Sequence, residues 1–259
     1  MGIFKRDNNA FESRIHEIDF FRGILIILVV FDHLMWFINY YIFKQQSGFL
    51  TWYWTSGLRY VVRQIVLMLF LFTCGISCHL SRNNLKRGLI LLCITILIPL
   101  VTRLLQPLPM FSNRVIIVDF NIIGVIALSI LLYACFEKHS NTDIWILVIM
   151  LFLVYQVILL AKEFSPSDEY NGFQSIFYVD FNPTKAGLIA DYLPLFPYII
   201  FLPLGVIFAR KFYKNKSSLL PRKDWEKPIC FLGRHTLIIY LAHEVILTPI
   251  FMGIGALIK

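Results

Sequence analysis

The stretch that decides the fold is residues 18–41, I-D-F-F-R-G-I-L-I-I-L-V-V-F-D-H-L-M-W-F-I-N-Y-Y. A helix needs about 20 predominantly apolar residues to cross a bilayer, and this run is longer than that. The run is also too long for the apolar part of a signal peptide, and no small-residue cleavage site follows it. We therefore expect residues 18–41 to form a retained first transmembrane helix.

The rest of the chain shares this apolar character. Of its 259 residues, 58% are hydrophobic and only 15% are charged, and the mean hydropathy is +0.70. A soluble globular domain carries about 25% charged residues, so the composition excludes that class, as well as a disordered chain. It predicts an all-α, polytopic transmembrane helical bundle, surrounded by membrane lipid, that forms one domain over residues 1–259.

Apolar runs and the cations between them predict the number of spans and their orientation. We expect seven spans, at residues 18–41, 58–79, 88–105, 116–136, 143–161, 192–212 and 229–258. Fourteen Lys and Arg residues then lie on the side of the N-terminus and five on the other side. Cytoplasmic loops carry the excess of Lys and Arg, which predicts a cytoplasmic N-terminus. The same bias explains the net charge of +8 without a nucleic-acid partner.

Ionisable residues at membrane depth are costly and are candidates for function. The first span contains Asp19, Arg22, Asp32 and His33. Arg22 and His33 are three helical turns apart, so they share a face with about 16 Å between them along the axis. Asp19 lies three residues before Arg22 on the same face. A plain ion pair at the membrane interface explains Asp19 and Arg22 equally well, and an ordinary interhelical hydrogen bond is the alternative for His33.

Asp32 points about 100° away from His33, toward a neighbouring helix. Arg59 and Arg63, in the second expected span, are candidate partners for this carboxylate and candidates for substrate binding.

A cationic turn follows the second span, with the sequence H-L-S-R-N-N-L-K-R-G over residues 79–88. Arg82, Asn83, Lys86 and Arg87 can hold phosphate groups through charge-assisted hydrogen bonds. An ordinary positively charged cytoplasmic loop explains the same residues.

The last span contains G-R-H-T-L-I-I-Y-L-A-H-E over residues 233–244. Its two histidines, His235 and His243, are eight residues apart, which is not a common ligand spacing, and the cysteines match no zinc pattern. We therefore expect no metal. Tyr240 and His243 are candidates for substrate binding and catalysis.

Several of these segments together resemble a known family, the heparan-alpha-glucosaminide N-acetyltransferase-like family of bacterial membrane proteins. The similar segments are R-I-H-E-I-D-F-F-R-G at residues 14–23 with F-D-H at 31–33, G-I-S-C-H-L-S-R-N-N-L-K-R-G at 75–88, F-N-I-I-G-V-I-A-L-S-I-L-L at 120–132, A-D-Y-L-P-L-F-P at 190–197 and F-L-G-R-H-T-L-I-I-Y-L-A-H at 231–243. That family is related to the acyltransferase 3 group. One departure is Asn121, where we expect family members often to carry His.

The resemblance implies transfer of an acetyl group from cytosolic acetyl-CoA to an amine or hydroxyl of an extracytoplasmic glycan or similar acceptor, across a bacterial cytoplasmic membrane. Arg14, Asp19 and Arg22 would join the cationic turn in binding the donor. His33 would be the catalytic base or nucleophile. Its ring would be oriented by Asp32, or by a polar group of another span, such as Asn121, Tyr240 or His243.

Asp191 stands at the expected outer mouth of the sixth span, where it can bind a polar acceptor or cap the helix. The outer loop before it, residues 162–191, mixes acids with aromatics, as expected for a sugar ligand or for a solvated interfacial loop.

Two other classes of function remain open. A transporter or flippase for a sugar or lipid intermediate would use the same intramembrane polar residues, although no internal repeat is visible. A non-catalytic membrane anchor would have little use for a buried histidine. Neither the identity of the acceptor nor self-association can be read from the sequence.

Overall fold

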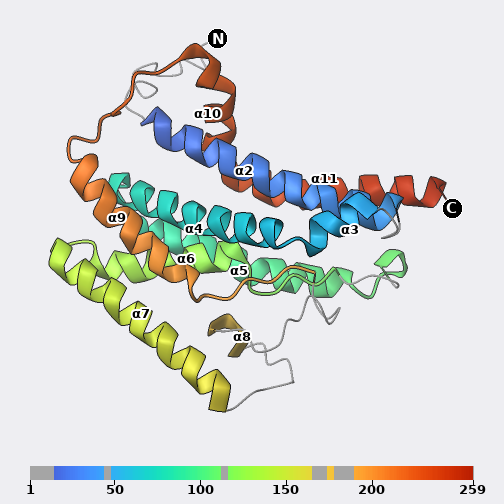
Figure 1. The fold of residues 1–259 in the computed structure, drawn as a ribbon, viewed down its shortest axis with the longest axis horizontal. Helices are drawn as coiled ribbons and strands as arrows, with labels where there is room; N and C mark the ends of the chain where they lie inside the picture. The colour runs from blue at the N-terminus through green and yellow to red at the C-terminus, as the bar shows by residue number, and fades with distance from the viewer. Residues whose placement is uncertain (1–14, 44–47, 112–115, 165–173, 178–189, 259) are drawn as a thin grey trace, which may run out of the picture. The chain divides into compact units, whose positions relative to one another are not determined.

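The described part of the chain is helical. The computed structural model describes residues 15–43, 48–111, 116–164, 174–177 and 190–258, and these contain helices and one isolated bridge but no β-strand (Figure 1). The all-α prediction is therefore confirmed. The chain forms two compact units, Met1–Thr73 with Tyr213–Lys259, and Cys74–Phe212.

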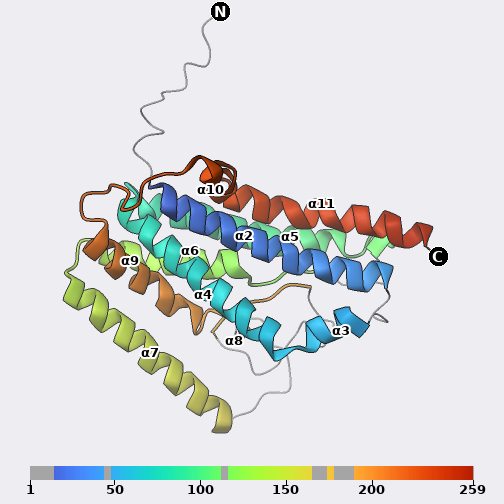
Figure 2. The same cartoon turned by 45° about the horizontal axis from the view of Figure 1, so that its top comes forward.

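The first unit combines both ends of the chain. Its elements are α2 (His16–Phe37), the π-helical turn η1 (Ile38–Ile42), α3 (Gly48–Thr55), the first part of α4 (Gly57–Leu80), η4 (Asp224–Glu226), α10 (Lys227–Arg234) and α11 (Thr236–Leu257). The N-terminal helix α2 packs against α10 and α11 (Figures 1 and 2). A core of Phe37, Tyr41 and Phe251 joins the end of α2 and η1 to α11.

Two glycines bring α2 and α10 into backbone contact. A Cβ atom on Gly23 would overlap the carbonyl group of Ile229, and one on Gly233 would overlap the carbonyl group of Asp19. Small residues allow helices to approach this closely in membranes. These glycines are therefore required by the packing of the first unit.

The seventh expected span, residues 229–258, is not one helix. α10 ends at Arg234 and α11 begins at Thr236, and the backbone of His235 between them leaves the helical region at φ −105°, ψ 17°. The hydroxyl of Thr236 donates to the carbonyl oxygen of Gly233 at 2.6 Å, which satisfies a group that the helix break leaves open. α10 is turned away from the axis of α11 (Figure 1), whereas α11 continues through Pro249.

The segment before α10 is bound to the start of α2. The backbone N–H of Leu219 donates to Glu17 at 2.6 Å, and the N–H of His16 donates to the hydroxyl of Ser218 at 3.3 Å. Burial, together with the charge of Glu17, raises the pKa of Tyr213 to about 12. The polar contacts at this end of α2 therefore hold the long connection in place.

The second unit contains the middle of the chain. Its elements are the last part of α4, α5 (Asn84–Leu105), η2 (Pro109–Phe111), α6 (Ile122–Phe136), α7 (Asn141–Phe164), α8 (Gln174–Phe177), η3 (Tyr198–Ile200) and α9 (Phe201–Phe212). α6 packs along α5 and is largely buried, with Val125, Ala127 and Ile130 fully enclosed.

Two expected spans are shorter than predicted because their first residues pair with each other. The helix expected over residues 116–136 begins at Ile122, and the one expected over 192–212 begins at Tyr198. In the residues before them, the N–H of Ala190 donates to Ile117 at 2.7 Å and the N–H of Leu193 donates to Phe120 at 2.8 Å. The two segments satisfy their backbone groups through this pairing, so neither needs a helix there.

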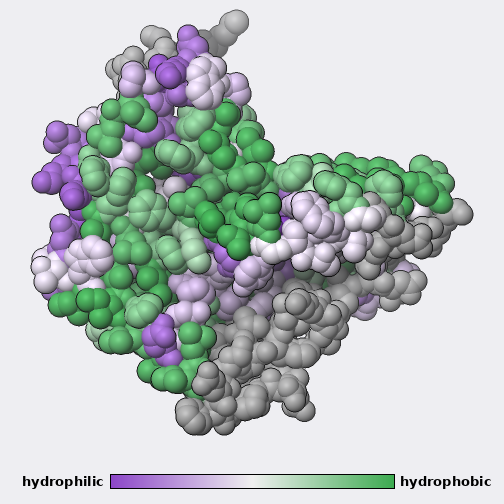
Figure 3. Space-filling model, viewed as in Figure 1, coloured by the Kyte–Doolittle hydropathy of each residue, from purple (hydrophilic) through white to green (hydrophobic). Residues whose placement is uncertain are grey.

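Five described helical segments are long and apolar enough to cross a membrane: His16–Ile42, Gly57–Leu80, Asn84–Leu105, Asn141–Ala161 and Thr236–Leu257. Many of their large hydrophobic side chains are exposed, and hydrophobic residues cover much of the visible surface (Figure 3). A soluble protein would not expose so much apolar surface, so the chain is an integral membrane protein. The count of seven spans and the cytoplasmic N-terminus stay predictions.

Candidate active site

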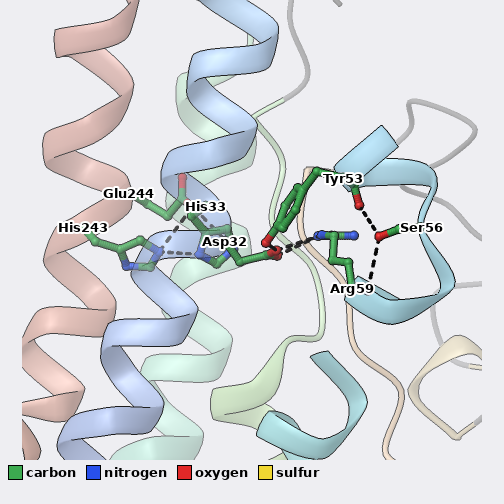
Figure 4. A network of polar contacts seen from close by, with 7 residues as sticks. All are labelled: Asp32, His33, Tyr53, Ser56, Arg59, His243 and Glu244. Atoms are coloured by element: carbon green, nitrogen blue, oxygen red, sulfur yellow. Dashed lines mark hydrogen bonds and ion pairs between the residues drawn. The ribbon is translucent and has the colours of Figure 1, made fainter. Parts of the chain in front are cut away.

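His33 and His243 meet in the first unit. His33 lies on α2 and His243 on α11, and the His33 Nδ1 and His243 Nε2 atoms are 2.8 Å apart (Figure 4). The rings are 4.7 Å apart between centroids. The side chain of His243 is 4% exposed and that of His33 is 30% exposed. The pair therefore has one enclosed member and one member that a substrate can reach.

The backbone of Tyr240 determines which nitrogens carry protons when both rings are neutral. Its carbonyl oxygen lies 2.6 Å from His243 Nδ1 and can only accept, so this nitrogen carries the proton. The Nε2 atom of neutral His243 then accepts from Nδ1–H of His33. The Nε2 atom of His33 is left with a free lone pair, which is what a base or nucleophile requires.

Glu244 lies next to the two rings. Its Oε1 atom is 3.4 Å from His243 Nε2 and 3.8 Å from His33 Nε2 (Figure 4). One ligand atom of each of the three side chains lies within 4.8 Å of the others, which is a spacing that can hold a metal ion. The sequence argument against a metal considered the spacing of His235 and His243 in the last span and the pattern of the cysteines, whereas this group joins two helices.

Asp32 faces the other side of α2, as the helical geometry predicts. It pairs with Arg59 on α4 through Nε–Oδ1 and Nη2–Oδ2 contacts of 2.8 and 2.6 Å, and Tyr53 donates to Oδ1 at 2.7 Å (Figure 4). The guanidinium of Arg59 also lies over the ring of Trp54, 3.5 Å from its centroid. Burial and the hydrogen bond to Asp32 raise the pKa of Tyr53 to about 12, so its hydroxyl stays protonated and donating.

We call Asp32, Arg59, Tyr53 and Trp54 the Asp32 cluster. It confirms Arg59 as one of the two predicted arginine partners of Asp32. Arg63 lies one helical turn beyond Arg59 on α4, and its role in substrate binding stays a prediction. The ring of His33 is hydrogen-bonded to His243 rather than to Asp32, and a catalytic role for Asp32 is likewise untested.

The residues predicted to bind the donor belong to different units. In the first unit, Asp19 lies 3.9 Å from Arg234, an ion pair that the sequence did not suggest. Among the described residues, the Nε atom of Arg22 is buried without a hydrogen-bond partner. Arg14 lies outside the described residues.

In the second unit, the cationic turn joins α4 to α5. Asn83 caps α5 by accepting from the N–H of Lys86 at 2.9 Å, and Arg87 donates to the carbonyl oxygen of Ser77 at 3.4 Å. Arg82 and Lys86 are exposed. Asn83 and Lys86 also border an open groove of about 470 Å³ along α5, otherwise lined by apolar side chains. Whether this turn and Arg22 bind one donor stays a prediction.

Asn121 and Asp191 belong to the second unit. Asn121 is buried and caps α6 by accepting from the N–H of Ile123 at 3.0 Å. Asp191 forms the isolated bridge with Val118. The helical part of the sixth expected span begins at Tyr198 rather than at Asp191, so the helix-cap interpretation of Asp191 is wrong. Their proposed parts in catalysis and in acceptor binding stay untested, and acids of the preceding loop, such as Asp168, lie outside the described residues.

Three residues near the two histidines and Asp32 were not predicted as site residues from the sequence. Tyr53 and Trp54 fit an aromatic segment at the membrane interface, yet both contact the Asp32–Arg59 pair. Glu244 has no suitable ligand spacing with His235 and His243, and only the approach of α2 brings His33 to it. No signal within one helix could show these contacts.

One comparison with known proteins identifies a family for the chain. Residues 14–245 match the family model described as heparan-alpha-glucosaminide N-acetyltransferase, catalytic. This match covers both histidines, the Asp32 cluster and the cationic turn. No curated protein and no solved structure matches the chain significantly.

Proposed function

The chain belongs to the heparan-alpha-glucosaminide N-acetyltransferase catalytic family and is a membrane acetyltransferase, and we propose that acetyl-CoA is its donor. The acceptor we propose is an amine or hydroxyl of an extracytoplasmic glycan or a similar molecule. The membrane would be the cytoplasmic membrane of a bacterium.

The observation that supports this proposal best is the hydrogen-bond chain from the Tyr240 carbonyl through His243 to His33. It leaves the lone pair of His33 Nε2 free on the more exposed of the two rings. Acyl transfer from a thioester needs a base that activates the acceptor, and imidazole has a suitable unperturbed pKa of about 6.5. We therefore assign Nε2 of His33 as the reacting atom.

The proposed reaction conserves atoms and protons. His33 Nε2 removes a proton from the acceptor amine or hydroxyl, whose nitrogen or oxygen attacks the acetyl carbonyl carbon. The carbon–sulfur bond then breaks, and the imidazolium returns its proton to the CoA sulfur. A two-step route through acetyl-histidine uses the same nitrogen. In both routes His243 holds the ring of His33 in position.

Donor and acceptor would contact different residues. For the donor we propose Arg14, Asp19, Arg22, Arg82, Asn83, Lys86 and Arg87, whose cations would pair with the phosphates of CoA. Arg59, Arg63, Tyr240 and Asp191 are the residues we propose for the acceptor, and Asp32 and Asn121 are proposed for catalysis beside His33 and His243.

Acetyl transfer by purified protein tests the proposal. The protein in nanodiscs is given acetyl-labelled acetyl-CoA with glucosamine as a probe acceptor, which offers both an amine and hydroxyls. We expect labelled N- or O-acetyl product to form. If neither this probe nor membrane glycans acquire label, while liposomes containing the protein take up the sugar, the transporter alternative replaces the proposal. Mass spectrometry of envelope glycans from cells with and without the protein would then identify the natural acceptor.

A further inference from the structure

The proposed reacting nitrogen, His33 Nε2, is one of three electron-rich atoms that lie close together. With both rings neutral, His33 Nε2 has a free lone pair, and His243 Nε2 uses its lone pair only for the bond from His33. The Oε1 atom of Glu244 lies 3.4 Å from His243 Nε2 and 3.8 Å from His33 Nε2. A carboxylate oxygen facing two lone pairs is repelled unless a cation lies between them. A metal ion bound by the three atoms removes this repulsion, as does a proton that converts one ring to an imidazolium.

The separations suit a transition-metal ion. Zinc bonds to His nitrogen and carboxylate oxygen at about 2.0–2.2 Å, so tetrahedral ligand atoms lie about 3.4 Å apart. The distances of 3.4 and 3.8 Å from Glu244 to the two Nε2 atoms are close to this value. His33 and Glu244 are 30% and 46% exposed, which leaves an entry path for the ion. His243 has the outer hydrogen bond to the Tyr240 carbonyl that metal-binding histidines usually have.

We propose that His33, His243 and Glu244 form a binding site for a divalent transition-metal ion of the zinc class. Nitrogen ligands favour Zn²⁺ or Co²⁺ over Mg²⁺ and Ca²⁺, which prefer oxygen. Binding replaces the His33–His243 hydrogen bond with three metal–ligand bonds and leaves a fourth coordination position open.

The site has a consequence that rests on the proposed function. A metal on His33 Nε2 occupies the lone pair that would accept the proton from the acceptor. Zn²⁺ therefore inhibits acetyl transfer, and a chelator restores it.

Metal binding is measured first without turnover. The protein in nanodiscs is stripped with EDTA, desalted and titrated with Co²⁺, whose visible absorption reports tetrahedral nitrogen and oxygen coordination. Zn²⁺ is then titrated against a chromophoric chelator. We expect each chain to bind one metal ion tightly. His243→Ala and Glu244→Gln should weaken this binding by at least about tenfold, the minimum effect of losing even an outer-shell partner of a metal site.

A matched control uses the other histidine of the same region. His235, between α10 and α11, bonds to the carbonyl oxygen of Phe231 in α10, so His235→Ala should leave Zn²⁺ affinity unchanged, and Mg²⁺ should not compete. Glu244→Gln keeps the size and a polar group, so it tests the site even if His243→Ala misfolds. An absence of tight Zn²⁺ binding, or equal affinity in wild type and Glu244→Gln, would overturn the proposal. Both results are independent of whether the protein transfers acetyl groups.

Zn²⁺ inhibition is measured separately in the acetyl-transfer assay, with each rate divided by that of the same variant in EDTA. We expect Glu244→Gln to need at least about tenfold more Zn²⁺ for half-inhibition, in line with its weaker binding. Tight binding at the site without inhibition would contradict the role of His33 in transfer but would leave the metal site intact.

Discussion

His33 and His243 are separated by 210 residues in the sequence, yet their rings share a hydrogen bond of 2.8 Å. One ring belongs to the first described helix and the other to the last described helix, so α2 and α11 build the candidate site together. The Tyr240 carbonyl fixes the orientation of His243, and His243 in turn fixes that of His33. Because His243 acts in the proposed reaction only by orienting His33, it is a positioning residue.

Replacing His243 should lower the turnover more than it lowers donor binding. Without the ring, His33 loses the acceptor for its Nδ1 proton, and a hydrogen bond of this kind contributes about 0.5–1.5 kcal/mol. We expect His243→Ala to reduce kcat by about three- to tenfold, to change KM for acetyl-CoA little, and to shift the pH profile of kcat. Steady-state kinetics over a pH series, in EDTA, provide the measurement. A loss confined to KM would contradict the positioning role.

The Asp32–Arg59 pair should stabilise the first unit only when both partners are present. Their side chains are 21% and 17% exposed, so Arg59→Met leaves a largely buried carboxylate unpaired. We expect the free energy of unfolding to fall by about 2–3 kcal/mol, somewhat less than the roughly 3–5 kcal/mol typical of breaking a buried pair. In the Arg59→Met variant, adding Asp32→Asn should restore part of this lost stability. Thermal unfolding in detergent compares the three variants, and a double variant less stable than Arg59→Met would contradict this account.

The close approach of α2 and α10 predicts opposite outcomes for two glycine substitutions. Gly23→Ala places a methyl group on the Ile229 carbonyl, and such overpacking costs about 1–3 kcal/mol. Gly253, on α11, has no atom within 4 Å of an added Cβ. Since Ala favours a helix by about 1 kcal/mol over Gly, Gly253→Ala should leave stability unchanged or raise it. Equal unfolding temperatures for the two variants would mean that α2 and α10 are not packed in this way.

The cationic turn should bind the phosphates of the donor. Charge-assisted hydrogen bonds contribute about 1.5–3 kcal/mol each, so we expect Arg82→Ala to weaken CoA binding about tenfold or more. Isothermal titration with CoA measures this, and Lys138→Ala, another cation of the same expected side, is the matched control. Unchanged CoA affinity in both Arg82→Ala and Arg87→Ala would remove the turn from the donor site.

The features that the sequence predicted correctly depend on the periodicity of single helices. The features that it missed depend on contacts between segments distant in the sequence. The first span was expected over residues 18–41 and lies within His16–Ile42, and the direction of Asp32 correctly suggested Arg59. The break at His235 and the pairing of residues 116–121 with residues 190–193 depend on contacts between segments distant in sequence. For the same reason the spacing of ligands along the sequence could not identify Glu244, because this residue of α11 meets His33 only through the packing of α11 against α2.

The most direct test of the central claim is the turnover of His33→Ala in the acetyl-transfer assay, run in EDTA with acetyl-labelled acetyl-CoA. Removing a general acid–base group costs about 10²–10⁴ in rate, so the account predicts no detectable transfer, with expression, folding and CoA affinity near those of wild type. A variant that keeps more than about a tenth of wild-type turnover, a loss well short of that range, would contradict the claim and make His33 a structural residue.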